Sequence, residues 1–200
     1  MQVVLATHNA GKLKEFQELL APFEFDIVSI SRFSSVAPEE TGLSFVENAI
    51  LKARHAARVS GRVAIADDSG IEVDALHGAP GIYSARYAGP GASDQENLEK
   101  LLADLRARPS ASRTARYQCA LALMRWETDP SPIVVQASWE GRIIDVPRGS
   151  GGFGYDPTFE LDSGLTAAQL PASEKNSLSH RGKALRMLVS RLRETSIAPT

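Results

Sequence analysis

The sequence has little of what would define several classes of protein. Its 200 residues contain a single cysteine, which excludes an intramolecular disulfide and a cysteine-based metal cluster. Cys119 lies in an apolar run, so we expect a buried core thiol rather than a nucleophile. The formal net charge is −2, far from the basic footprint of proteins that bind duplex nucleic acid. We therefore expect no nucleic-acid partner, and an anionic ligand would need donors concentrated at one place.

Long apolar segments are also absent. The sequence holds no apolar stretch of about 18 residues, and the run at residues 3–6 is too short for a signal sequence or a membrane span. We therefore expect a cytoplasmic protein with no membrane partner. The content of 43% hydrophobic and 23% charged residues is typical of a globular chain. A single α/β domain over residues 1–200 is expected from this length.

Helices and strands alternate in the first half of the sequence. The apolar run at residues 3–6 predicts a strand, and residues 13–20 carry apolar side chains at helical spacing. Ser44, with Glu47 three residues later, predicts the start of a second helix, which Gly61 ends. Residues 63–66 are apolar throughout, as in a central buried strand.

The second half of the sequence changes this pattern. Asp94 is expected to cap a further helix, and long strands are expected at residues 114–126 and 133–146. A turn containing Asp129 separates the two strands, and a last helix closes the chain. Because adjacent strands follow an alternating βα region, we predict a mixed α/β sheet.

The first polar loop joins the first strand to the first helix. It supplies a hydroxyl, an amide, a glycine and a lysine over residues 7–12. Free backbone N–H groups and partial positive charge at a helix N-terminus suit a phosphate. The loop is not a P-loop, because Ala6 stands where that motif needs a glycine. The alternative is an ordinary strand-to-helix turn capped by Asn9.

The second polar loop is expected at residues 67–70, where the buried strand ends. Successive strand side chains point to opposite faces, so Asp67 and Asp68 are expected to have different roles. Two such carboxylates are costly unless they are paired or bind a metal, and Mg²⁺ prefers carboxylate and phosphate oxygens. Glu39 or Glu40 could supply a further ligand. The alternatives are a solvated turn and two plain surface glutamates.

Two further loops contain groups suited to a nucleotide base. Glycines around Phe153 let the backbone approach a ligand, Phe153 can stack on a base, and Asp156 can accept a hydrogen bond. Residues 173–183 precede the last helix, and the donor fork of Arg181 fits the O6 and N7 acceptors of a 6-oxopurine. The alternatives are a hairpin turn with a packed phenylalanine and an exposed basic turn.

Taken together, these segments resemble the bacterial inosine/xanthosine triphosphate pyrophosphatases. The resemblance runs in family order from residue 3 to about residue 193, and His8 stands where some members have glycine. It is carried by residues 6–12, 39–42, 47–53, 66–70, 78–87, 152–157 and 179–182. The family implies an elongated mixed β-sheet flanked by helices, two lobes around a nucleotide cleft as in the related Maf proteins, and a homodimer.

The resemblance also implies an activity and the residues that carry it. The reaction is hydrolysis of dITP, ITP or XTP, with water attacking the α-phosphorus, to the nucleoside monophosphate and pyrophosphate. Asp68 is then the catalytic acid/base carboxylate and binds Mg²⁺, with Glu39 as a second metal ligand. Substrate binding falls to Thr7, His8, Asn9, Ala10, Gly11, Lys12, Lys52, Ser69, Phe153, Gly154, Tyr155, Asp156, Lys175, His180 and Arg181.

Two other functions remain open at this point. A Maf-like hydrolase would act on pyrimidine or modified nucleoside triphosphates. Base preference in a pyrophosphate-release assay distinguishes it from a pyrophosphatase of dITP, ITP and XTP. A nucleotide-binding regulator without turnover would be indifferent to Asp68→Asn. The adjacent carboxylates and the absence of a basic face argue against the regulator.

Overall fold

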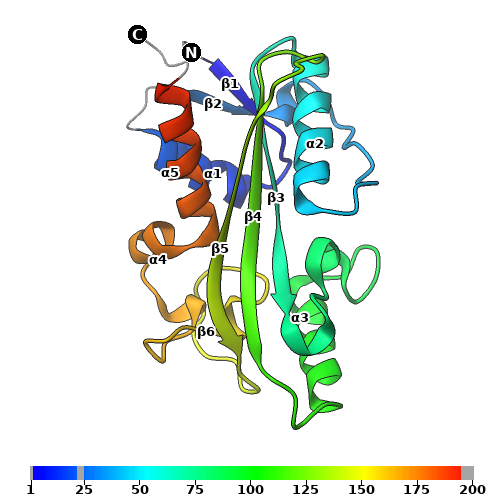
Figure 1. Ribbon diagram of the computed structural model, residues 1–200, viewed down its shortest axis with the longest axis vertical. Coiled ribbons are helices and arrows are strands. Elements are labelled where there is room, and N and C mark those ends of the chain that lie inside the picture. The colour runs from blue at the N-terminus through cyan, green and yellow to red at the C-terminus, as the bar shows by residue number, and fades with distance from the viewer. Residues whose placement is uncertain (1, 22–24, 195–200) are drawn as a thin grey trace. The chain divides into compact units, whose positions relative to one another are not determined.

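The computed structural model describes residues 2–21 and 25–194 and has a mixed α/β fold (Figure 1). Its sheet has six strands in the order β2-β1-β3-β4-β5-β6. Strand β1 (Gln2–Leu5) is parallel to β2 (Asp26–Ser29) and to β3 (Ala64–Val73). Strands β4 (Thr114–Met124) and β5 (Ile133–Ile143) are long, and β5 pairs antiparallel with β6 (Phe159–Glu160). The predicted mixed sheet with flanking helices is confirmed.

The chain divides into two compact units, and each unit has its own apolar core. Unit 1 contains the chain up to Asp68, the segment Cys119–Ala137, and the chain from Arg181 onward. Unit 2 contains Ser69–Gln118 and Ser138–His180. Strands β3, β4 and β5 each contribute residues to both units. The single domain over residues 1–200 stays a prediction.

In unit 1, helices cover both faces of the sheet (Figure 1). Helices α1 (Ala10–Leu20) and α5 (His180–Arg193) contribute Phe16 and Leu188 to a core that contains Ile65 of β3. Helix α2 (Phe45–Ser60) lies on the other side and buries a row of alanines, which lets its backbone approach the sheet closely. In the part of β3 that belongs to unit 1, odd-numbered residues therefore face α1 and α5, and even-numbered ones face α2.

Helix α2 has the predicted ends. The Ser44 side chain accepts a hydrogen bond from the backbone N–H of Glu47, and the Glu47 carboxylate accepts from the Ser44 hydroxyl and from the N–H of Leu43. Gly61 has a left-handed φ of 62°, and its N–H donates to the carbonyl of Ala57. Both ends of the helix are therefore fixed by local hydrogen bonds that the sequence specifies.

Unit 2 is built around helix α3 (Asp94–Arg106) and the remaining parts of the long strands. Leu98, Leu101 and Leu105 of α3 are buried in a core that also contains Trp139 and Phe159. A 3₁₀ helix (Gly81–Arg86) precedes α3, and the short helix α4 (Ala172–Leu178) follows β6. These elements surround the glycine-rich segment that holds Phe153.

Three sequence predictions of local structure are wrong. Residues 67–70 are not a loop but lie within β3, because ion pairing lets Asp67 and Asp68 stay buried in a strand. The cap of α3 is Ser93 rather than Asp94, since Ser93 and Glu96 form a complete capping box. Residues 173–183 are largely helical, in α4 and the first turn of α5.

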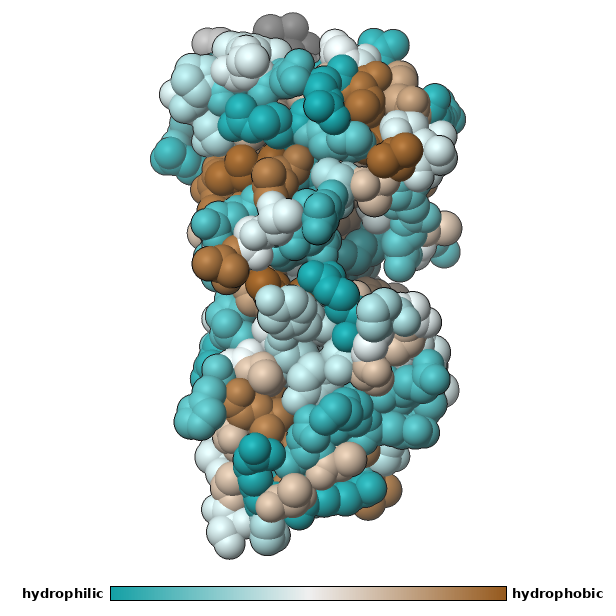
Figure 2. Space-filling model, turned by 90° about the vertical axis from the view of Figure 1, so that its right-hand side faces the viewer, coloured by the Kyte–Doolittle hydropathy of each residue, from teal (hydrophilic) through white to brown (hydrophobic). Residues whose placement is uncertain are grey.

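The face of the molecule that Figure 2 shows is mainly hydrophilic. On this face, apolar residues form several separate groups among polar ones (Figure 2). The most exposed large apolar side chains are Leu43, Val146 and Val36, and each lies in a connecting segment. Scattered exposed apolar residues are normal for a globular protein. Within the described residues, no helix is both long and apolar enough to cross a membrane.

Asp129 stabilises the turn between β4 and β5. Its buried carboxylate accepts hydrogen bonds from the backbone N–H groups of Arg125 and Ser131 and from the Arg125 guanidinium. These hydrogen bonds, with that of the guanidinium the strongest, hold the pKa of Asp129 well below its usual range. A carboxyl whose pKa is lowered in the folded state stabilises the fold at pH values above the pKa that the same carboxyl has in the unfolded chain, about 4.

We expect Asp129→Ala to lower the free energy of unfolding at pH 7 by about 2 kcal/mol, measured by urea denaturation. The difference from the native chain should shrink as the pH falls below about 4, where the carboxyl of the unfolded chain takes up a proton, and should vanish once the folded carboxyl is protonated at lower pH. The exposed Asp162 provides the control, and Asp162→Ala should change stability by less than about 0.5 kcal/mol. Equal stabilities of the two variants would contradict this role.

Candidate active site

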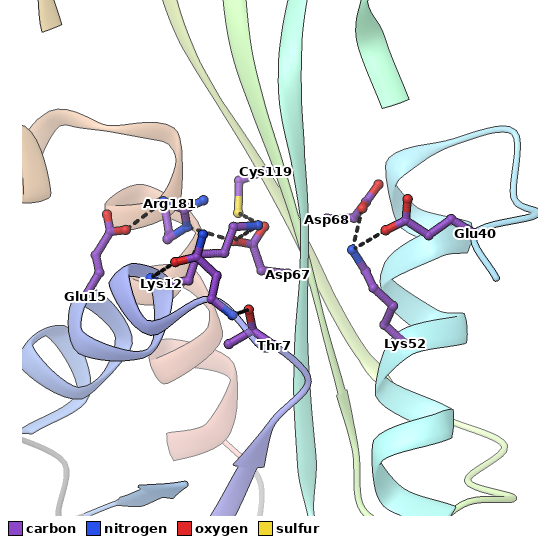
Figure 3. A network of polar contacts seen from close by, with 10 residues as sticks. Thr7, Lys12, Glu15, Glu40, Lys52, Asp67, Asp68, Cys119 and Arg181 are labelled. Carbon is purple, nitrogen blue, oxygen red and sulfur yellow. Dashed lines mark hydrogen bonds and ion pairs between the residues drawn. The ribbon is translucent and has the colours of Figure 1, made fainter. Parts of the chain in front are cut away.

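The site in unit 1 is built on the two adjacent aspartates of β3. Asp67 and Asp68 are both buried, and their side chains point to opposite faces of the strand (Figure 3). Asp67 pairs with Lys12 and Arg181, whereas Asp68 pairs with Lys52 of α2. The expectation that the two side chains point to opposite faces is therefore confirmed, and their different roles stay a prediction.

Asp68 shares a lysine with a second carboxylate. Nζ of Lys52 lies 2.5 Å from Oδ1 of Asp68 and 3.1 Å from Oε1 of Glu40. The other oxygen of Asp68, Oδ2, is buried and has no hydrogen-bond partner among the residues that the structure describes. One half of this carboxylate is thus fixed by a lysine, while the other half can accept a proton, a hydrogen bond or a cation.

Burial sets the protonation behaviour of this pair. Burial raises the pKa of Asp68 above its ordinary value, although the charge of Lys52 acts in the opposite direction. Burial, the largest single effect, disfavours the charged lysine, but the charge and hydrogen bond of Asp68 together with the charges of Glu40 and Asp67 outweigh it, so the pKa of Lys52 is raised. Lys52 therefore stays protonated, and Asp68 takes up a proton more readily than an exposed aspartate does. A perturbed carboxyl of this kind is suited to acid/base chemistry.

Glu40, rather than Glu39, lies beside Lys52 in this structure. Glu39 is exposed, so its predicted role as a metal ligand stays a prediction that the structure does not support by proximity. Helix α2 holds residues 39–42, here called the acidic segment, through Asn48, whose Oδ1 accepts a hydrogen bond from the N–H of Gly42 at 2.9 Å. A Cβ on Gly42 would lie 2.6 Å from Cβ of Glu47. The sequence analysis did not single out Asn48, although its place four residues before Lys52 on α2 was a signal.

The donors around Asp68 fit a hard cation better than a transition metal. Within residues 2–21 and 25–194, no group of three or more His, Cys, Asp or Glu side chains could hold a metal ion by itself. Asp68 and Glu40 offer carboxylate oxygens, and Asp68 Oδ2 is an unsatisfied buried acceptor. Such a pair suits Mg²⁺, which usually takes one or two carboxylates and completes its ligands with water and substrate phosphate.

The loop at residues 7–12 forms a capped helix start. Oδ1 of Asn9 accepts the N–H of Lys12 at 3.0 Å, and Oγ1 of Thr7 accepts the N–H of Asn9 at 3.1 Å. Helix α1 then begins at Ala10, with no acidic residue in its first turn. The exposed His8 has Nδ1 3.0 Å from Oγ of Ser31. The backbone N–H groups at this terminus favour an anion.

Arg181 lies in a buried ion-pair network on the Asp67 side. Its Nε donates to Asp67 at 2.8 Å, and its Nη1 donates to Glu15 at 2.7 Å (Figure 3). Burial by itself would lower the pKa of Arg181, but the two carboxylates outweigh it, so the guanidinium stays charged. Cys119 is buried as expected, with Sγ 3.8 Å from Oδ1 of Asp67. In this structure Arg181 binds carboxylates, and its predicted contact with a base stays a prediction.

We expect Arg181→Met to lower the free energy of unfolding by about 3–5 kcal/mol, because Asp67 would be left as a buried charge without its main cation. Urea denaturation measures this loss, and the double variant Arg181→Met/Asp67→Asn should recover part of it. The control is Arg191→Met, which removes an exposed ion pair between the same helix and Glu194 and should alter stability by less than about 0.5 kcal/mol. If both single variants lose the same amount, the network does not stabilise the fold.

The second group of predicted site residues lies in unit 2, around Asp156. Oδ2 of Asp156 accepts the N–H of Phe153 at 2.9 Å and also accepts from Nζ of Lys175. Lys175 lies 5.0 Å from the ring centroid of Phe153, a cation–π contact, and the ring is half exposed. A Cβ on Gly152 would fall 2.0 Å from Asp156 Oδ2, so only glycine allows this approach.

The other predicted residues of unit 2 differ in exposure. Tyr155 is buried, and its hydroxyl donates to the carbonyl of Ser84 at 2.7 Å, while the N–H of Gly154 donates to Asp94 at 2.9 Å. His180 is buried against Tyr117. Ser69 is half-buried in β3. The structure therefore brings Phe153, Asp156 and Lys175 together, whereas Tyr155 supports the fold beneath them.

These features define a class of protein. A mixed α/β sheet carries a capped strand-to-helix turn suited to phosphate and a buried carboxylate beside a lysine, a combination suited to phosphate chemistry. The Ham1 family model matches residues 3–191. The chain belongs to the Ham1 family.

Curated relatives and solved structures agree with this assignment. The chain is 57% identical over 194 residues to a dITP/XTP pyrophosphatase of Vibrio vulnificus (strain YJ016), covering 96% of this chain and 97% of the relative. It is 55% identical over 193 residues to one of Escherichia coli O157:H7, covering 96% and 98%. A HAM1 protein from Coxiella burnetii has a TM-score of 0.91 at 48% identity, covering 98% and 100%.

A more distant solved structure has the same fold. The nucleoside-triphosphatase / dITP/XTP pyrophosphatase from Mycobacterium abscessus has a TM-score of 0.76 at 38% identity, covering 94% of this chain and 99% of its own. The resemblance predicted from the sequence motifs is thus confirmed along nearly the whole chain.

Proposed function

We propose that this chain hydrolyses dITP, ITP and XTP to the nucleoside monophosphate and pyrophosphate. Its relatives at 55–57% identity are dITP/XTP pyrophosphatases. The observation that carries the proposal is the buried Asp68, with one oxygen held by Lys52 and the other without a hydrogen-bond partner among the described residues. Because these substrates belong to the cellular nucleotide pool, we place the activity in the cytoplasm.

The two groups of predicted residues would bind different parts of the substrate. The backbone N–H groups and side chains of residues 7–12, together with Lys52, Ser69 and Lys175, would hold the triphosphate. Phe153 would stack on the base, and Asp156, His180 and Arg181 would surround it. This assignment corresponds to the two lobes and the nucleotide cleft that the family resemblance implies, as in the related Maf proteins. The proposed assembly is a homodimer.

Asp68 would act as the base for a water molecule. The water oxygen forms a bond to the α-phosphorus while the bond from that phosphorus to the α–β bridging oxygen breaks, and pyrophosphate leaves. The proton of the water passes to Oδ2 of Asp68, the oxygen that Lys52 does not occupy. Burial, which raises the pKa of Asp68, makes this carboxylate a better proton acceptor than an exposed aspartate.

We further propose Mg²⁺ as the cofactor, held by Asp68 and Glu40. Bound there, the ion would neutralise the negative charge that collects on the phosphate oxygens. Lys52 lies against both carboxylates and would keep them oriented while adding positive charge beside the reacting phosphate. Glu39, the ligand expected from the family resemblance, would then lie outside the cluster.

The test of this function is pyrophosphate release from dITP, XTP, dGTP and dATP with Mg²⁺. We expect strong preference for dITP and XTP, and a loss of at least about 100-fold in kcat for Asp68→Asn, because the amide cannot accept the proton. Asp162→Asn, an exposed aspartate, serves as the control and should retain full activity. Equal cleavage of all four nucleotides would remove the base-recognition role, and nucleotide binding without turnover would favour a regulator.

A second variant tests the acidic segment. We expect Gly42→Ala to push the segment away from α2, since the added Cβ would lie within 3 Å of Glu47 and Asn48. Glu40 would then leave Lys52, and the Mg²⁺ concentration for half-maximal activity should rise several-fold, with a smaller change in KM for dITP. Titration of activity with Mg²⁺ measures this. Gly164→Ala, at an exposed turn with a φ of 80° where an added Cβ meets no atom within 4 Å, controls for backbone strain without a steric clash and should keep the native Mg²⁺ requirement. An unchanged Mg²⁺ requirement in Gly42→Ala would exclude Glu40 as a ligand.

A further inference from the structure

Tyr117 contacts two of the residues expected to surround the base, and the sequence analysis gave it no role. The residue lies in the part of β4 that belongs to unit 2, and its side chain is buried. Its hydroxyl donates to Oδ1 of Asp156 at 3.1 Å. Its ring stacks on His180, with centroids 4.8 Å apart and planes 8° from parallel. One side chain thus sets the position of a carboxylate and of an imidazole.

The ring of Tyr117 is itself held firmly. It lies against Phe159 at a centroid distance of 4.7 Å and against Trp139 at 6.4 Å. Both aromatic partners are buried in the core of unit 2. Buried aromatic groups in such contacts have little freedom to move, so the hydroxyl of Tyr117 points in a fixed direction.

The hydrogen bonds of Asp156 show why that direction matters. An ionised carboxylate can accept about four hydrogen bonds, two on each oxygen. Oδ2 of Asp156 already accepts from Phe153 and Lys175, and Oδ1 accepts from Tyr117. The described residues therefore leave one acceptor position, on Oδ1. The terminal torsion of an aspartate is broad, so donors on both oxygens are needed to fix where this last position points.

We propose that Tyr117 is a positioning residue for base recognition, which directs the remaining acceptor position of Asp156 and the ring plane of His180. This inference rests on the proposed function. Hypoxanthine and xanthine carry a hydrogen on N1, whereas N1 of adenine carries a lone pair. A carboxylate oxygen directed at that position accepts from the first two bases and repels the third, so fixing its direction increases discrimination against adenine.

The experiment compares Tyr117→Phe with the native full-length chain on dITP, XTP and dATP. The variant keeps the ring stack and removes only the hydroxyl. We expect KM for dITP and XTP to rise about five- to tenfold with kcat changed less than about twofold, as for loss of one positioned hydrogen bond. The ratio of kcat/KM for dITP to that for dATP should fall by a similar factor.

The matched control is Tyr87→Phe. Tyr87 is a tyrosine of the same unit whose hydroxyl donates to Asp104 at 2.6 Å. It loses the same kind of hydrogen bond to a carboxylate, and its dITP-to-dATP ratio should stay at the native value. A merely structural effect of Tyr117→Phe would lower kcat/KM for all three nucleotides equally, because a smaller folded fraction affects them alike.

Each outcome is decisive for one of the two claims. If the native chain does not cleave dITP or XTP, the proposed function is wrong. If the native chain cleaves them and Tyr117→Phe keeps the native ratio, whatever its absolute activity, the positioning role of Tyr117 is wrong. A fall in the ratio for Tyr117→Phe alone supports it, and the same fall in Tyr87→Phe would overturn it.

Discussion

The structure of unit 1 depends on the burial of two adjacent negative charges in one β-strand. Isolated buried carboxylates are costly, so each of Asp67 and Asp68 needs a cation, and the alternation of β3 directs them to opposite faces. The cations come from the helices on those faces, Arg181 from α5 and Lys52 from α2. The ion pairs therefore fix both helices against the strand that carries the candidate catalytic group.

The two faces differ in how completely they satisfy these charges. Asp67 meets Arg181, Lys12 and the thiol of Cys119, and Arg181 also meets Glu15, so this face forms a closed network. Among the residues that the structure describes, Asp68 has a hydrogen-bond partner on one oxygen alone, which is Lys52. The closed network around Asp67 stabilises the fold. The unfilled oxygen of Asp68 is the position at which a bound ligand would gain the most binding free energy. The same residue type thus serves structure and chemistry in consecutive positions, as the opposite faces of a strand permit.

Much of this could be predicted from the sequence where the signal is local. The ends of α2 follow from Ser44, Glu47 and Gly61, and the opposed directions of the β3 aspartates follow from strand geometry. Local patterns carry no signal for contacts between residues that are distant in the sequence. No local pattern shows that Arg181 meets Glu15, or that Glu40 reaches Lys52 rather than Glu39. The strand continues through residues 67–70 because cations from other elements offset the low strand propensity of aspartate and glycine.

The aspartates of this chain differ in function according to how many acceptor positions their neighbours leave open. Asp129 accepts four hydrogen bonds, from two backbone N–H groups and twice from the Arg125 guanidinium, and has a purely structural place in a turn. From the described part of the chain, Asp156 accepts three and keeps one position. Asp68 accepts one from the same part of the chain, from Lys52. Because a carboxylate has about four such positions, the capacity to take a proton, a cation or a base N–H increases in that order. A buried acceptor position without a partner costs free energy in the ligand-free protein. A ligand that fills such a position recovers that free energy, and it recovers most at Asp68.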